Sequence, residues 1–214
     1  MGSNWVLLPD GKILLVGGTE KTFSPPLETA ELFDPLGPAD SGTWRSMKNR
    51  PKDAFNEVIR RGYHSAAILL PGGEIALMGG ADAAPFLGFG ESMHSVDLFK
   101  PPYWFYSQRP SLTAVPAEIR YPTTTSTNAF CIDTNKPHCI KRACLIGIGS
   151  VTHHFDYGQR YIELMTRWSN CGDGNAIEVF PPPKASLAPP GYYMLFLVDV
   201  NLLPSAGTIV KVDY

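Results

Sequence analysis

The sequence lacks an excess of charge of either sign. Its 214 residues carry 18 Lys and Arg against 20 Asp and Glu, a net charge of −2. That balance removes the electrostatic argument for a nucleic-acid partner or an anionic membrane surface. Long hydrophobic runs are also missing, because no stretch approaches the roughly 20 apolar residues that span a bilayer. We therefore predict that neither nucleic acid nor a membrane is a partner.

An export signal is missing from the chain as written. The N-terminal segment Met-Gly-Ser-Asn-Trp-Val-Leu-Leu-Pro has no basic region and no long apolar core. It therefore does not have the pattern of a signal peptide.

Cysteine is absent before Cys131, and tyrosine is absent before Tyr63. No Cys-x-x-Cys occurs among Cys131, Cys139, Cys144 and Cys171, so the usual zinc spacing is excluded. Two interpretations of the cysteines remain, a hairpin disulfide Cys131–Cys139 or four buried thiols. A disulfide would favour an oxidising compartment.

Turn-forming and aromatic residues are plentiful. The chain has 20 Gly, 20 Pro and 11% aromatics, a composition that suits an all-β protein rich in turns. The apolar fraction of 44% suffices for a core, and the length allows one large or two modest domains.

An internal repeat organises the first half. Leu-Leu-Pro-Asp-Gly-Lys-Ile-Leu-Leu-Val-Gly-Gly at 7–18 returns as Leu-Leu-Pro-Gly-Gly-Glu-Ile-Ala-Leu-Met-Gly-Gly at 69–80. Each copy predicts strand, tight turn, strand, and a further strand follows at 29–35 or 95–101. The pattern is typical of kelch-type propeller blades, and about two blades are present. No helix pattern follows either Gly-Gly pair, so a phosphate-binding loop is excluded. Residues 53–60 are interpreted as a loop.

Prolines after residue 100 mark a change of pattern. Beyond them we expect short strands at 127–133, 142–148, 161–165, 176–179, 192–198 and 208–212. Such a series fits an immunoglobulin-like sandwich. The predicted fold is all-β, with a partial kelch-type β-propeller in a domain 1–103 and an early-set β-sandwich in a domain 104–214.

Three side chains suggest a metal site. Tyr63 and His64 open a strand-like run, and His153 lies about 90 residues further on. Two imidazoles and a phenol suit copper and do not suit magnesium or calcium. A lone histidine near a strand start is more often a structural hydrogen-bonding group, and His154 is assigned to surface or packing. In an extended segment His153 and His154 would point to opposite faces.

Several motifs in order resemble one family over nearly the whole chain. Arg-Gly-Tyr-His-Ser at 61–65, Asp-Leu-Phe-Lys-Pro-Pro-Tyr at 97–103 and Arg109-Pro110 are similar to the last propeller part of galactose and glyoxal oxidases. Thr152-His153, Gln159-Arg160 and Pro-Pro-Gly-Tyr-Tyr-Met-Leu-Phe at 189–196 are similar to their C-terminal early-set domain.

The resemblance implies a copper-radical oxidase, which oxidises a primary alcohol or aldehyde with O₂ and releases H₂O₂. It implies that Tyr63 is the axial copper ligand and the catalytic base, and that His64 and His153 are equatorial ligands. It also implies an extracellular location. Gln159 and Arg160 are expected to hold their loop. Asp156 and Arg160 are expected to pair, either to orient the loop or as a plain surface salt bridge.

The family's second redox group, a tyrosine linked to a cysteine, belongs to earlier blades and is not encoded here. We therefore expect a chain that resembles the C-terminal part of the oxidase, is inactive alone, and has the remaining blades as a partner. The alternatives are a non-catalytic module that binds carbohydrate or protein, with Trp104, Phe105 or Tyr106 as a stacking surface, and an incomplete product without independent function.

Overall fold

The structure is a computed structural model that describes residues 2–20, 27–37, 41–49, 59, 61–81, 94–169, 171 and 175–214. Apart from Ile59, the loop predicted at 53–60 lies outside the described residues. The all-β prediction is confirmed, since strands dominate and the described helices are short 3₁₀ turns, η2 (Pro102–Phe105) and η3 (Pro137–Cys139).

The chain forms two compact units. Unit 1 comprises Met1–Leu70, Glu74–Phe99 and Gly149–Gln159. Unit 2 comprises Pro71–Gly73, Lys100–Ile148 and Arg160–Tyr214. Residues 149–159 lie within the predicted second domain in sequence but pack with the first half of the chain.

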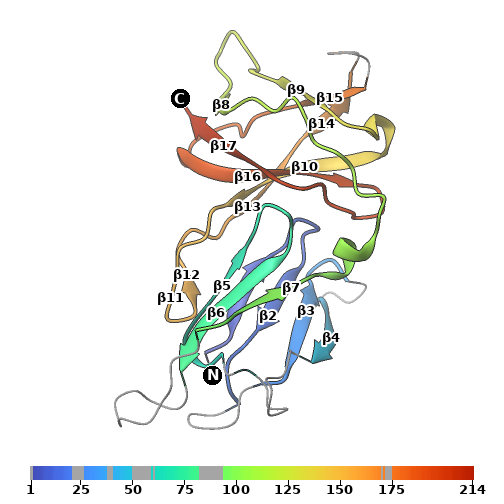
Figure 1. Cartoon of the computed structure of the whole chain (residues 1–214). Coiled ribbons are helices and arrows are strands. Elements are labelled where there is room, and N and C mark those ends of the chain that lie inside the picture. Colours follow the sequence, from blue (N-terminus) through green and yellow to red (C-terminus); the bar gives the residue numbers. More distant parts are fainter. Residues whose placement is uncertain are drawn as a thin grey trace. The chain divides into compact units, whose positions relative to one another are not determined.

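Unit 1 contains two antiparallel sheets that match the internal repeat (Figure 1). The first sheet has the order β1-β2-β3-β4, and the second has the order β5-β6-β7. Their bounds are β1 (Asn4–Leu7), β2 (Ile13–Val16), β3 (Thr29–Asp34), β4 (Thr43–Asn49), β5 (Tyr63–Leu69), β6 (Ile75–Ala81) and β7 (Val96–Phe99). Neighbouring strands in sequence are neighbours in each sheet, the meander expected of propeller blades.

The repeated Gly-Gly pairs have a backbone reason. Gly17, Gly18, Gly79 and Gly80 all have positive φ, at 75°, 84°, 64° and 100°. A Cβ at Gly17 would lie 2.9 Å from the carbonyl oxygen of Arg61. Only glycine combines this conformation with so close a backbone approach.

A short hairpin completes unit 1. Its strands are β11 (Val151–Thr152) and β12 (Phe155–Asp156), and β11 lies beside β5 (Figure 1). The hairpin follows β10 (Ile140–Gly147) and precedes β13 (Tyr161–Leu164), two paired strands of unit 2. The hairpin therefore belongs to the long connection between β10 and β13, two strands of the sandwich.

Unit 2 holds a five-stranded sheet, β13-β10-β16-β17-β8, and a three-stranded sheet, β14-β15-β9. The remaining bounds are β8 (Glu118–Arg120), β9 (Phe130–Asp133), β14 (Thr166–Trp168), β15 (Ala176–Val179), β16 (Gly191–Asp199) and β17 (Thr208–Asp213). One core cluster takes alternate residues of the long strands, among them Leu145, Leu195 and Val210. The period of two is that of sandwich strands.

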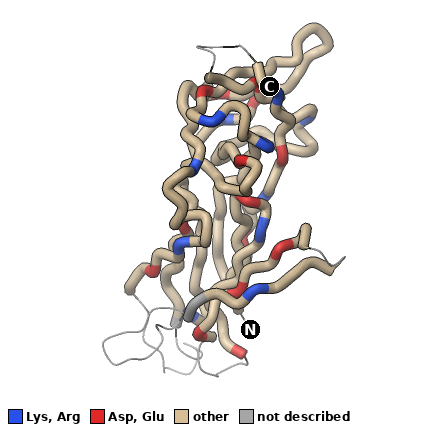
Figure 2. Tube along the Cα trace, turned by 90° about the vertical axis from the view of Figure 1, so that its right-hand side faces the viewer, with Lys and Arg blue, Asp and Glu red and all other residues tan. Residues whose placement is uncertain are grey.

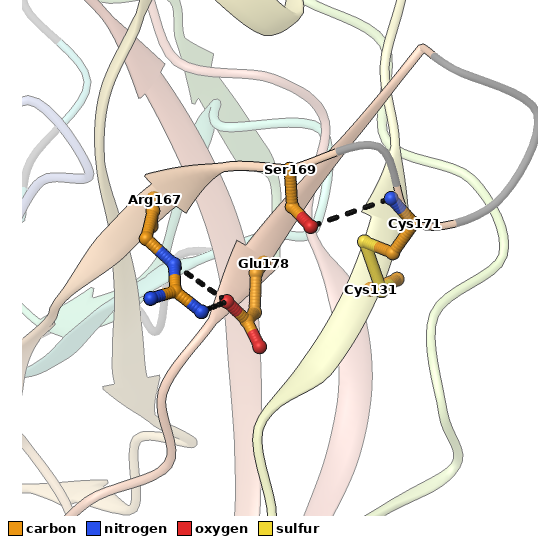
Figure 3. Close-up of a disulfide and its surroundings, with 5 residues drawn as sticks. All are labelled: Cys131, Arg167, Ser169, Cys171 and Glu178. Carbon is orange, nitrogen blue, oxygen red and sulfur yellow. Dashed lines mark hydrogen bonds and ion pairs between the residues drawn. A yellow bond between two sulfur atoms is a disulfide. The ribbon is translucent and has the colours of Figure 1, made fainter.

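Both interpretations of the cysteines, the Cys131–Cys139 disulfide and the four buried thiols, are wrong. Cys131 pairs with Cys171 (Figure 3). Cys139 is an exposed free thiol and Cys144 a buried one. β15 pairs with both β14 and β9, and the disulfide joins Cys131 of β9 to Cys171, which follows β14 in the chain. On the same sheet the exposed Arg167 pairs with Glu178 (Figure 3). Sheet order, rather than sequence spacing, therefore selects the bonded cysteines.

Basic and acidic residues are interspersed along the chain, without a stripe of one sign in the described residues (Figure 2). Among these residues, no helix has the length and apolar character needed to cross a membrane.

Candidate metal centre

Tyr63 and His64 are the first two residues of β5, and the backbone is turned at this point. The Ser65 N–H donates to the Gly62 carbonyl at 3.1 Å, and His64 itself has a φ of 62°. In the register of the strand pair, Tyr63 lies opposite Ala81 and Ser65 opposite Gly79. The left-handed residue between them leaves the His64 side chain exposed, while the Ser65 side chain is buried.

His153 and His154 are the two loop residues of the β11–β12 hairpin. Thr152 pairs with Phe155, and the φ values of the two histidines are 52° and 66°. Positive φ at both loop positions is the signature of a type I′ turn, which suits the twist of a two-residue hairpin. The segment is thus not extended, and the expectation of opposite faces for the two histidines does not apply.

The structure brings the three predicted residues together within unit 1. His64 Nε2 and His153 Nε2 are 3.0 Å apart. The Tyr63 ring centroid lies 3.9 Å from that of His64 and 5.7 Å from that of His153. Tyr63 is half-buried, and both imidazoles are exposed. A solvent-reachable cluster of two imidazoles and a phenol follows, from segments 89 residues apart.

Backbone strain concentrates at this cluster. Among the described residues, six non-glycine residues have positive φ, and three of them are His64, His153 and His154. A non-glycine residue in this region costs of order 1 kcal/mol or more, and such residues gather at functional sites. The imidazoles are held in position at an energetic cost that packing elsewhere must offset.

Arg61 anchors the start of β5. Its side chain is fully buried and its guanidinium contacts both carboxylate oxygens of Asp97 at 3.1 Å. It also donates to the Gly79 carbonyl at 2.8 Å and to Ser95 Oγ at 2.9 Å. The Arg61 carbonyl accepts from Gly18 N–H at 2.8 Å. The Arg61 side chain therefore links β6 and β7 to the segment that leads into Tyr63 and His64.

The hairpin is held by its own polar residues. Asp156 accepts from the N–H groups of Ser150 and Gly158, at 2.9 and 3.0 Å. Gln159 accepts from Leu7 N–H and donates to the Trp5 carbonyl, two groups on the edge strand β1. The expectation that Gln159 holds its loop is confirmed. Arg160 donates to the Leu187 carbonyl, rather than pairing with Asp156.

The donor set fits copper on the geometry of its nitrogens. Metal–imidazole bonds are about 2.0–2.1 Å long, so two at a right angle place their nitrogens about 2.9 Å apart. The observed separation of 3.0 Å fits two adjacent ligands of one ion, and equally an imidazole–imidazole hydrogen bond. Among the described residues, no group of three or more His, Cys, Asp and Glu side chains could hold a metal, and the ring of Tyr63 lies beside the two imidazoles.

His153 has a hydrogen-bonding partner in the side chain of its neighbour Thr152. His153 Nδ1 lies 2.8 Å from Thr152 Oγ1. When Nδ1–H donates to that hydroxyl, the lone pair of Nε2 faces His64. Donation of the second ring N–H to an acceptor is the usual support of a metal-bound histidine.

His154 is half-buried against unit 1 and was assigned only to surface or packing. Burial, and then the nearby His153 and His64, lower its pKa below the usual 6.5. Its Nδ1 lies 3.4 Å from Ser65 Oγ. A Cβ at Gly2 would lie 2.6 Å from its Nε2. Sequence reasoning assigned His154 no role in the site and Arg61 none beyond its place in the motif at 61–65, because neither carries a local signal of its own.

Comparison with known proteins finds similarity over nearly the whole chain. Residues 109–212 match the family model "Galactose oxidase-like, Early set domain". The chain is 29% identical to "Aldehyde oxidase GLOX1" of Arabidopsis thaliana, over 98% of this chain and 35% of that protein. It is 30% identical to "Galactose oxidase" of Gibberella zeae, over 97% of this chain and 28% of that protein.

A solved structure is similar as well. A fungal alcohol oxidase of the AA5 family, in complex with copper, matches with a TM-score of 0.78 and 27% identity. The match covers 99% of this chain and 42% of that one. The chain thus spans well under half the length of these relatives.

Proposed function

From the premise that the chain is a relative of galactose oxidases and glyoxal-type aldehyde oxidases, with a galactose oxidase-like early set domain, we propose that unit 1 carries the protein ligands of a copper site. The ligands are His64, His153 and Tyr63. The site serves the oxidation of a small primary alcohol or aldehyde by O₂. For an alcohol, RCH₂OH and O₂ give RCHO and H₂O₂.

One observation carries this proposal, the 3.0 Å approach of the two exposed Nε2 atoms. Exposed imidazoles gain little from a hydrogen bond to each other, because water competes for the same groups. Three strained histidine backbones are a high cost for such a bond. A shared metal ion accounts for the approach, the exposure and the strain together.

The proposed roles follow from the atoms available. Tyr63 Oη is the base that takes the hydroxyl proton of the substrate, and His64 and His153 fix the site through their Nε2 atoms. Bound copper supplies a one-electron acceptor, whereas oxidation of an alcohol removes two electrons. Tyr63, His64 and His153 by themselves include no second group that takes the other electron. The chain by itself is proposed to bind copper without turnover, the remaining propeller blades being its partner.

Copper titration followed by electron paramagnetic resonance tests the ligand set. We expect one Cu²⁺ with nitrogen ligands in the full chain, and an affinity at least tenfold weaker in both His64→Ala and His153→Ala. The matched control is His138→Ala, because His138 stacks on Trp168 within unit 2. Unchanged spectra in both ligand variants would contradict the assignment.

A non-catalytic carbohydrate-binding role is the second candidate. Phe105 is 75% exposed and Tyr106 is 59% exposed, as a sugar-stacking surface requires. Trp104 fits that role less well, since Lys100 and Arg109 lie over its ring at 5.3 and 5.2 Å. Glycan binding by the copper-free chain that is lost in a Phe105→Ala, Tyr106→Ala variant would favour this candidate.

We also propose an extracellular location. The Cys131–Cys171 disulfide supports it, because disulfides persist in oxidising compartments and are rare in the cytosol. Mass spectrometry of the natural protein would detect the bond. Both cysteines found as free thiols in protein prepared without reductant would speak against the proposal.

A further inference from the structure

Ser65 lies at the centre of a buried polar network beside the two imidazoles. It is 1% exposed, and so is Asn4 of β1. Its Oγ lies 2.9 Å from Asn4 Nδ2, 3.1 Å from the Arg61 carbonyl oxygen and 3.4 Å from His154 Nδ1. Three segments far apart in sequence therefore meet at one hydroxyl.

The hydrogen-bonding capacity of that hydroxyl favours one tautomer of His154. A serine hydroxyl has one proton to donate and two lone pairs to accept with. The proton goes to the Arg61 carbonyl, which can only accept, and the Asn4 amide N–H occupies one lone pair. The contact with His154 Nδ1 is then satisfied only when Nδ1 carries the proton and donates to the second lone pair.

The Ser65–His154 contact joins the same two segments as the His64–His153 approach, one residue further along each segment. Ser65 follows His64 and His154 follows His153. The outer pair meets at 3.0 Å and the inner pair at 3.4 Å. The outer pair is exposed, whereas the inner contact includes the fully buried Ser65. The inner pair is thus the better protected of the two links between β5 and the hairpin.

We propose that the Ser65–His154 pair is the positioning contact that holds His153 Nε2 opposite His64 Nε2. Its consequence for copper rests on the proposed function, but the contact itself does not. The type I′ turn is unfavourable for two histidines, so an attachment to β5 through the turn residue itself is what keeps the ligand in place. His154 acts through His153 and is not itself a ligand.

Two substitutions at position 154 separate the effect of the side chain on copper binding from that of the backbone conformation. His154→Asn tolerates positive φ and keeps an N–H donor near the position of Nδ1. His154→Gly tolerates positive φ and removes the donor. We expect copper binding within threefold of the unsubstituted chain for His154→Asn, and about 10–100-fold weaker for His154→Gly and for Ser65→Ala, the usual cost of losing a ligand's support.

The double variant His154→Gly, Ser65→Ala should bind copper no more weakly than either single variant, because both remove one contact. In all of these variants the electron paramagnetic resonance spectrum should keep both nitrogen ligands. Wild-type affinity in His154→Gly overturns the proposal. So does the loss of a nitrogen ligand, since His154 would then be a ligand.

A copper-free measurement keeps the two proposals apart. ¹⁵N imidazole spectra of the full chain should show His154 protonated at Nδ1, and Ser65→Ala should abolish that preference. His154 protonated at Nε2 in the unsubstituted chain overturns the positioning contact whatever copper does. The expected tautomer in a chain that binds no copper refutes the proposed function and leaves the contact standing.

Discussion

The two units hold their important residues in place by different means. In the sandwich of unit 2, alternate residues such as Leu145 and Leu195 are fully buried, and hydrophobic burial fixes the strands. In unit 1, the imidazoles of His64 and His153 are exposed, and burial cannot hold them. Their position depends on buried polar groups one or a few residues away. The comparison predicts that changes to the polar groups beneath the imidazoles disturb the candidate site, whereas unit 2 depends on its apolar core.

Of the changes considered, replacing Arg61 should lower the stability of unit 1 the most. Arg61→Ala leaves Asp97, whose side chain is 9% exposed, without the guanidinium that neutralises it. Removing one partner of a buried ion pair typically costs roughly 3–5 kcal/mol in the free energy of unfolding. Chemical denaturation followed by tryptophan fluorescence measures the loss, and copper affinity should fall with it.

The matched control is an arginine pair at the surface of unit 2. The Arg167 side chain is 67% exposed beside Glu178, so Arg167→Ala should cost less than about 1 kcal/mol. Equal losses in the two variants would show that burial of the ion pair is not what distinguishes Arg61.

Removing the disulfide tests unit 2 instead. The bond closes a loop with a sequence separation of 40, and its loss in Cys131→Ser, Cys171→Ser should lower the free energy of unfolding by roughly 2–4 kcal/mol. Cys139→Ser is the control, because that thiol is free and exposed. Under conditions where both proteins are folded, copper affinity should be unchanged. A weaker copper affinity would mean that the two anchoring systems are coupled.

The smallest effect expected is a pH dependence from His154. Its pKa is lowered by burial in the folded chain, so the unfolded chain binds more protons just below pH 6.5. Stability should therefore fall as pH drops through 6.5 toward the lowered pKa, and be fully present above 6.5. Denaturation midpoints between pH 5 and 7.5 measure this, and His154→Asn should reduce the slope. An unaltered slope in that variant would assign the dependence to other groups.

Most of the sandwich could be predicted from the sequence, because each strand carries its own alternation. The expected strands at 161–165 and 176–179 correspond to β13 and β15. The disulfide could not be predicted, since it depends on the sheet order β14-β15-β9 rather than on the spacing of Cys131 and Cys139.

The candidate site was predicted in part. The matched motif identified Tyr63, His64 and His153, and the structure places them together; their role as ligands stays a proposal. The turn at His153-His154 gave no signal, because type I′ turns are usually recognised by Asn and Gly. The Ser65–His154 contact depends on two segments meeting in space, which a single sequence does not reveal.

The hairpin that carries His153 has a consequence for folding kinetics. It is joined at both ends to β10 and β13, yet its partners are β1 and β5, so the cluster closes a chain loop of 89 residues. Contacts of such long range form late, because the entropy of loop closure must be met before they contribute. We expect each sheet to form before the two imidazoles meet. The 3.0 Å pair would then be among the last native contacts to appear, and metal uptake during refolding would report the completion of unit 1.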